Sequence, residues 1–228
     1  MLQAPERHEI DHHTSKLIVG LIALSMANLT SFFAATPITS ISASYYEGGW
    51  SQNIFVGFLF AISAFLFAYN GETRRQMVLS KVAACAALGV AMFPCKCKTH
   101  AEIVPHVHGI SAAVMFLILA FFCYVFYQRA MGKGHTQAKR RAYVYAISGI
   151  AIIASILVLA IDGLTGGAVS SKIVRLTFYG ERTGLIAFGI SWLTASRALP
   201  FFTTREERLL PFSDRASSAG SDTLAARK

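Results

Sequence analysis

The chain has 228 residues, of which 54% are hydrophobic and only 14% are charged, and its mean hydropathy is +0.49. That balance exceeds what a soluble domain of this length needs for its core, so it argues against a soluble globular protein and for an integral membrane protein. The formal net charge of +9 is also compatible with nucleic-acid binding. However, the basic residues gather at predicted helix ends, so we expect membrane lipids as partners and no nucleic acid.

Six apolar runs follow one another along the chain, each near the roughly 20 residues that a helix needs to cross a hydrocarbon layer of about 30 Å. The six prolines all lie outside these runs, as expected because proline disrupts a helix interior. The runs show neither the polar stripe of a soluble bundle nor the alternation of β-barrel strands. They predict an all-α, polytopic membrane helix bundle with transmembrane helices at residues 16–35, 53–69, 77–93, 108–128, 143–161 and 177–196.

The two ends of the chain differ in composition from the apolar centre. Residues 1–15 are polar, and the C-terminal end is rich in Ser, Ala and charged residues. Such segments bury too little apolar surface to fold alone. We therefore predict a disordered tail at 1–15, one six-helix domain at 16–199 and a largely disordered tail at 200–228.

Lysine and arginine are unevenly shared among the predicted loops. They are frequent after the second, fourth and sixth helices and sparse after the others. Because positive charge near helix ends is retained in the cytoplasm, both termini are predicted to be cytoplasmic. The residues that carry this prediction are Arg74, Arg75, Arg129, Lys133, Lys139, Arg140, Arg141, Arg197, Arg205 and Arg208.

Small residues indicate where helices approach each other closely. The third predicted helix carries so many Ala and Gly residues that it is expected to lie at the centre of the bundle. On the sixth helix, Gly180 and Gly184 form a small-xxx-small pair that predicts a contact with another helix.

Ionisable residues of the membrane region collect at the end opposite the cytoplasm. Asp162 ends the fifth helix, Glu181 lies about one turn into the sixth, and His106 and His108 open the fourth. Ionisable groups near hydrocarbon are costly, so they often line a polar cavity or pair with one another.

Three interpretations of this cluster stay open. In the first, Glu181 pairs with Arg182, Arg175 or Lys172 and the histidines are merely interfacial. In the second, an outward-facing polar cavity binds or transports a lipid or a small solute. In the third, the protein is a metal-dependent membrane hydrolase acting on a lipid, in which His106, His108 and an acid hold Zn²⁺ while a second acid activates water. The catalytic candidates would then be His108, Glu181 and Asp162.

The four cysteines fall into two groups. Cys85 and Cys123 lie inside predicted helices and are interpreted as packing residues. Cys95 and Cys97 lie in an outer loop near His106 and His108, where thiolates and imidazoles suit zinc or copper. These two thiols are also exposed to oxidation outside the cytoplasm. A Cys95–Cys97 bond would close a small strained ring, so unpaired thiols are expected.

Several short motifs resemble a known family: TPITSISASYY at 36–46, NIFVG at 53–57, ALGVAMFP at 87–94, HGISAA at 108–113 and AFGISWL at 187–193. They are similar to a DUF998-like family of bacterial six-helix integral membrane proteins of unknown function, which is distantly similar to the Frag, DRAM and Sfk proteins. The resemblance implies a six-helix architecture, the bacterial inner membrane and binding residues at the motif positions Ser42, Tyr46, His108 and Glu181. It implies no activity, so a structural or assembly role also stays open.

A looser similarity is to seven-helix membrane hydrolases of the alkaline ceramidase and adiponectin-receptor type. This chain lacks a seventh helix and their spaced histidines.

Overall fold

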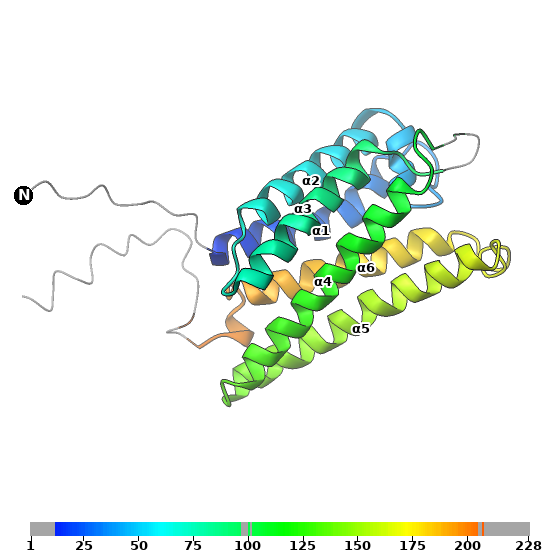
Figure 1. The fold of residues 1–228 in the computed structure, drawn as a ribbon. Helices are drawn as coiled ribbons and strands as arrows, with labels where there is room; N and C mark the ends of the chain where they lie inside the picture. Colours follow the sequence, from blue (N-terminus) through cyan, green and yellow to red (C-terminus); the bar gives the residue numbers. More distant parts are fainter. Residues whose placement is uncertain (1–11, 97–99, 101, 205–206, 208–228) are drawn as a thin grey trace, which may run out of the picture.

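A computed structural model describes residues 12–96, 100, 102–204 and 207 (Figure 1). Over these residues the fold is all-α, as predicted. The six long helices are α1 (His12–Phe32), α2 (Gly49–Ala68), α3 (Arg74–Met92), α4 (Val107–Met131), α5 (Thr136–Leu164) and α6 (Leu176–Ala195), and two short 3₁₀ helices are η1 (Ser42–Tyr46) and η2 (Pro200–Phe202).

Each long helix begins before the apolar run that predicted it, but only α4 and α5 also end after it, and α1 ends at Phe32, before the predicted residue 35. α5 begins at Thr136 rather than at residue 143, because its backbone hydrogen bonds continue through residues 136–142, where Lys139, Arg140 and Arg141 interrupt the apolar pattern. α1 begins at His12, so the predicted disorder of residues 1–15 is wrong for residues 12–15. The length of an apolar run reflects the thickness of the hydrocarbon layer. A helix continues for as long as its backbone hydrogen bonds do, so its ends need not coincide with the ends of the run.

Five of the helices, α1 to α5, are long and apolar enough to cross a membrane. α6 has 20 residues, as many as α2, but it contains Glu181 and Arg182 and is not among the five. Length and composition thus support a multi-pass membrane protein.

The six helices pack as a closed ring in chain order, and α6 returns to pack against α1. α3 packs between α2 and α4 rather than at the centre, so that prediction is wrong. Its Ala83, Ala84 and Ala87 are buried against the neighbours, while Val78 and Val82 on the outer face are exposed. The small residues therefore let two neighbouring helices pack closely against one face of α3. Such packing does not require α3 to be surrounded by helices.

The backbones of α1 and α6 come closest at two glycines. A Cβ atom on Gly20 would lie 2.8 Å from the backbone nitrogen of Leu193, and one on Gly189 would lie 2.7 Å from Cγ of Leu24. The predicted pair on α6 also faces other helices, with Gly180 against Leu159 of α5 and Gly184 against Phe116 of α4. Glycines therefore set the spacing of α6 from three of its neighbours.

The two ends of the bundle are built differently. The end where α1 begins and η2 lies is here termed the terminal end (Figure 1). Large aromatic side chains fill its interior. Trp192 is fully buried and packs against the rings of Tyr69, Phe122, Phe126 and Phe188. The opposite end, here termed the η1 end, carries η1 and the α3–α4 and α5–α6 connections. It is covered by these connections and contains the cavity described below.

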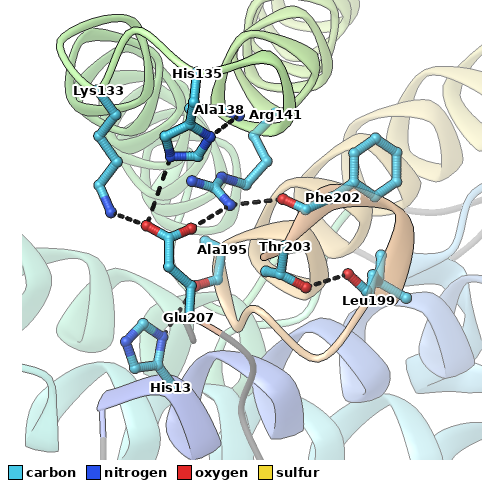
Figure 2. A network of polar contacts seen from close by, with 10 residues as sticks. All are labelled: His13, Lys133, His135, Ala138, Arg141, Ala195, Leu199, Phe202, Thr203 and Glu207. Atoms are coloured by element: carbon cyan, nitrogen blue, oxygen red, sulfur yellow. Dashed lines mark hydrogen bonds and ion pairs between the residues drawn. The ribbon is translucent and has the colours of Figure 1, made fainter. Parts of the chain in front are cut away.

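Part of the predicted C-terminal tail is bound to the terminal end (Figure 2). The carboxylate of Glu207 accepts hydrogen bonds from Lys133 and from Arg141 Nη1 at 2.9 Å, and Arg141 also donates to the carbonyl of Phe202 at 2.6 Å. Burial opposes ionisation of Glu207, but the hydrogen bonds from Lys133 and Arg141 outweigh it and lower its pKa to about 2. The predicted disorder is therefore wrong for residues 200–204 and for Glu207.

Candidate functional site

A cavity of about 690 Å³ lies at the η1 end of the bundle. Its volume is in the range of small-molecule sites, about 300–1,000 Å³. The lining residues of α5 run from Ile152 to Gly163, which is a rise of roughly 16 Å along the helix. All six helices contribute to it, and most of its wall is apolar: Met26, Phe55, Leu59, Val90, Met115, Phe116, Ile152, Ile156, Leu159 and Leu185.

Glu181 gives the cavity its main polar group. Its Oε2 accepts hydrogen bonds from the backbone nitrogens of Ile41 at 2.5 Å and Ser42 at 3.2 Å. Its Oε1 accepts a hydrogen bond from the hydroxyl of Ser42. The segment before η1 is thus fastened to α6 through one carboxylate, and Ser42 and Glu181 both line the cavity.

The interpretation that Glu181 pairs with a basic neighbour is wrong for the described residues. Arg182 Nη2 instead donates to Oδ1 of Asn28 at 2.8 Å, and Arg175 Nε donates to the carbonyl of Ile38 at 2.8 Å. No ion pair of Glu181 occurs in the described part of the chain. Backbone N–H groups take the place of a cation, because they supply donors to a carboxylate without a second buried charge.

His108 lies on the first turn of α4, is only 7% exposed and lines the same cavity. Its Nδ1 lies 2.7 Å from the carbonyl oxygen of Phe93, which can only accept a hydrogen bond. Nδ1 therefore carries a hydrogen. Glu181 lines this cavity as well. Of the predicted binding residues, Ser42, His108 and Glu181 are thus brought together.

His106 and Asp162 do not join this group. His106 is exposed, has a left-handed backbone conformation with φ 66°, and its N–H donates to Glu102 Oε2 at 2.8 Å. Asp162 Oδ1 accepts hydrogen bonds from the backbone nitrogens of Val169 and Ser170 at 2.9 and 2.8 Å. Neither residue lines the cavity. Asp162 instead orders the connection between α5 and α6.

Tyr46, the remaining predicted binding residue, links η1 to the α3–α4 connection. Its hydroxyl donates to the carbonyl of Cys95 at 3.0 Å, and its ring stacks on His100 with centroids 4.1 Å apart. Burial, with the nearby Tyr45 and Glu102 as smaller causes, raises the pKa of Tyr46 above its usual value. Tyr46 does not line the cavity. Its contacts instead hold η1 to the α3–α4 connection, and these two segments cover the η1 end.

The expectation of unpaired thiols is wrong for Cys95, which is disulfide-bonded. Cys97 lies outside the described residues. Cys85 and Cys123 are free; Cys123 is buried, as predicted for a packing residue, whereas Cys85 is exposed. A disulfide sulfur is not a thiolate, so Cys95 in this form is not a metal ligand of the kind predicted.

The donor set of the hydrolase hypothesis is not assembled by the described residues. No three His, Cys, Asp or Glu side chains among them lie close enough to hold a metal ion. His108 lines the cavity while His106 is exposed outside it, although the two were predicted as a ligand pair. Two residues apart at the start of a helix, they point in different directions, since one turn takes 3.6 residues.

Several groups at the site were not predicted from the sequence. They include Lys96, which is exposed and lines the cavity, and the backbone nitrogen of Ile41. The sequence does show Lys96 as a charged residue next to a predicted helix end, which is the signal that could have indicated it. A backbone N–H carries no sequence signal, because every residue except proline has one.

No protein-family model, curated protein or solved structure matches this chain.

Proposed function

We propose that this protein binds a small amphipathic molecule, a lipid or a lipid-like solute, in the cavity at the η1 end. The observation that supports it best is a long apolar cavity that ends at two inward polar side chains, Glu181 and His108. An apolar chain would be sheltered along α5 and α4, while a polar head would meet the carboxylate and the imidazole. Beyond the hydrogen bonds that they make within the protein, Glu181 and His108 each have an acceptor position that a ligand head can fill.

We further propose that α6 is the sixth transmembrane helix and that both termini lie in the cytoplasm of a bacterial inner membrane. The terminal end carries Arg74, Arg75, Lys139 and Arg140, whereas the η1 end carries few basic residues. This asymmetry supports an outward-facing cavity. With exposed Cys85 replaced by Ala, a Lys139→Cys variant should react with an impermeant maleimide only after the membrane is opened. A Lys172→Cys variant should react in intact cells, and the reverse pattern would contradict the orientation.

The binding proposal is tested with a glycine that lines the cavity. A Cβ atom on Gly109 has open space around it, so Gly109→Leu should fill the cavity without straining the fold. Gly57 on α2 also has open space but lies outside the cavity lining, which makes Gly57→Leu a matched control. Native mass spectrometry of protein purified in mild detergent should show one bound amphiphile in the wild type and in Gly57→Leu, and several-fold less in Gly109→Leu.

The same preparation separates the remaining hypotheses. Equal occupancy in all three proteins would contradict a binding cavity and leave a structural or assembly role. A metal ion retained in stoichiometric amount after washing would instead favour the hydrolase. Replacing Glu181 or His108 by Ala should lower occupancy, and unchanged occupancy in both variants would contradict their role in the site.

A further inference from the structure

The polar end of the cavity offers hydrogen-bond acceptors. A carboxylate has about four acceptor positions. In Glu181, two on Oε2 are used by the backbone nitrogens of Ile41 and Ser42, and one on Oε1 is used by the hydroxyl of Ser42. With three donors in place, one acceptor position on Oε1 is left for a further donor. A cationic donor there would also stabilise the buried carboxylate, because a paired charge is less costly to bury than an unpaired one.

His108 adds a second acceptor. Because its Nδ1 donates to the carbonyl of Phe93, the neutral ring has its lone pair on Nε2. The protein thus fixes the tautomer through a backbone atom, and Nε2 is left to accept. Since Glu181 and His108 share the cavity end, a ligand head there meets a carboxylate and an imidazole acceptor at once.

Charge in the cavity wall points the same way. Its acidic residues are Glu102 and Glu181, and its basic residue, over the described part of the chain, is Lys96. Lys96 is exposed, whereas Glu181 is held inside by hydrogen bonds from Ile41 and Ser42. An anionic head group would therefore meet a buried carboxylate and no buried cation, which is costly in a medium of low dielectric constant.

From this arrangement we propose that the ligand is an amphiphile whose head donates hydrogen bonds and carries positive charge, an alkylammonium, rather than a phosphate or a carboxylate. The inference rests on the proposed binding function and adds the class of head group. The ammonium donates to Oε1 of Glu181 and to Nε2 of His108, while the alkyl chain lies along α5 between Ile152 and Gly163.

The test compares dodecylamine with dodecyl phosphate, which share one chain length. Both are titrated into wild-type protein in phosphatidylcholine nanodiscs, and binding is measured by native mass spectrometry. We expect dodecylamine to bind at least ten-fold more tightly. Glu181→Gln should remove that preference, whereas Asp162→Asn, which changes an acid outside the cavity, should keep it.

The outcomes distinguish this inference from the binding proposal. If neither compound binds, or if Gly109→Leu changes neither, the cavity proposal itself fails. If the phosphate binds as tightly as the amine in a manner sensitive to Gly109→Leu, the cavity stands and the head-group inference is overturned. The wild-type comparison needs no variant, so a Glu181→Gln protein that does not fold leaves the inference testable.

Discussion

Two donor groups of Ser42 bind the same carboxylate. Its backbone nitrogen and its hydroxyl both donate to Glu181, 139 residues away in the chain. Hydrogen bonds to a charged group are stronger than neutral ones, at about 1.5–3 kcal/mol each. The segment at η1 that covers the cavity is therefore held to α6 mainly through Ser42. Tyr46 and the carbonyl of Cys95 make a second, separate fastening.

Replacing Ser42 by Ala should lower the unfolding free energy by about 2 kcal/mol, because Glu181 loses one donor while buried in the bundle. Ser44 gives a matched control: it is fully buried, and its hydroxyl has no hydrogen-bond partner among the described residues. Ser44→Ala should be neutral or slightly stabilising. Thermal unfolding in detergent measures both, and equal Tm values for the two variants would contradict the role of Ser42.

At the scale of helices, the α1–α6 contact depends on the absence of side chains. Gly20 and Gly189 let the two backbones meet, which closes the ring and fixes the position of Glu181 relative to Ser42. Packing is the main source of helix association within a membrane. A methyl group on Gly20 must displace backbone atoms of α6 rather than a flexible side chain.

Gly20→Ala should therefore destabilise the protein by about 1–3 kcal/mol, the usual cost of overpacking. Gly57→Ala has open space around its added Cβ atom and should be neutral or slightly stabilising, because Ala favours helix more than Gly does. Tm in detergent is the measurement. A stable Gly20→Ala protein beside an unstable Gly57→Ala protein would show that the crossing is looser than described.

The helices could be predicted from the sequence more completely than the site. Each apolar run depends on residues close together in the chain, so six helices and their approximate ends were predictable. The site depends on contacts such as that of Glu181 with Ile41, which are 140 residues apart and use a backbone donor. Small residues on α3 were read as a sign of a central position, although two neighbouring helices suffice to bury them. The docking of Glu207 was missed because its basic partners lie in the α4–α5 region.

For the molecule as a whole, the start of α1 and the segment after α6 both make polar contacts at the terminal end. His13 Nδ1 lies 3.3 Å from the carbonyl of Ala195, and Glu207 binds Lys133 and Arg141 (Figure 2). The side chain of Arg141 is only 4% exposed and that of Glu207 only 17%. The α4–α5 turn is thus tied to the segment after α6.

This tie should depend on pH. A carboxylate whose pKa falls from 4.5 to about 2 on folding stabilises the folded state above pH 4.5, and this contribution is lost as the pH falls toward 2. Glu207→Gln should therefore lower Tm at pH 7, and its difference from wild type should shrink below pH 4.5. Glu72, whose side chain is 70% exposed in its pair with Arg129, is the control, and Glu72→Gln should change stability by less than about 1 kcal/mol. A difference for Glu207→Gln that stays constant down to pH 3 would mean that its charge contributes nothing.

The closed ring also bears on how the protein is made. Chains fold from the N-terminus during synthesis, so α6 is the last helix to reach its place. Unlike the other five long helices, α6 is not among those apolar enough to cross a membrane, and it contains Glu181 and Arg182. The groups that receive those two side chains, Ile41, Ser42 and Asn28, belong to the first segments synthesised. The partners of Glu181 and Arg182 are therefore synthesised before α6, and the cavity is complete only when α6 packs against them.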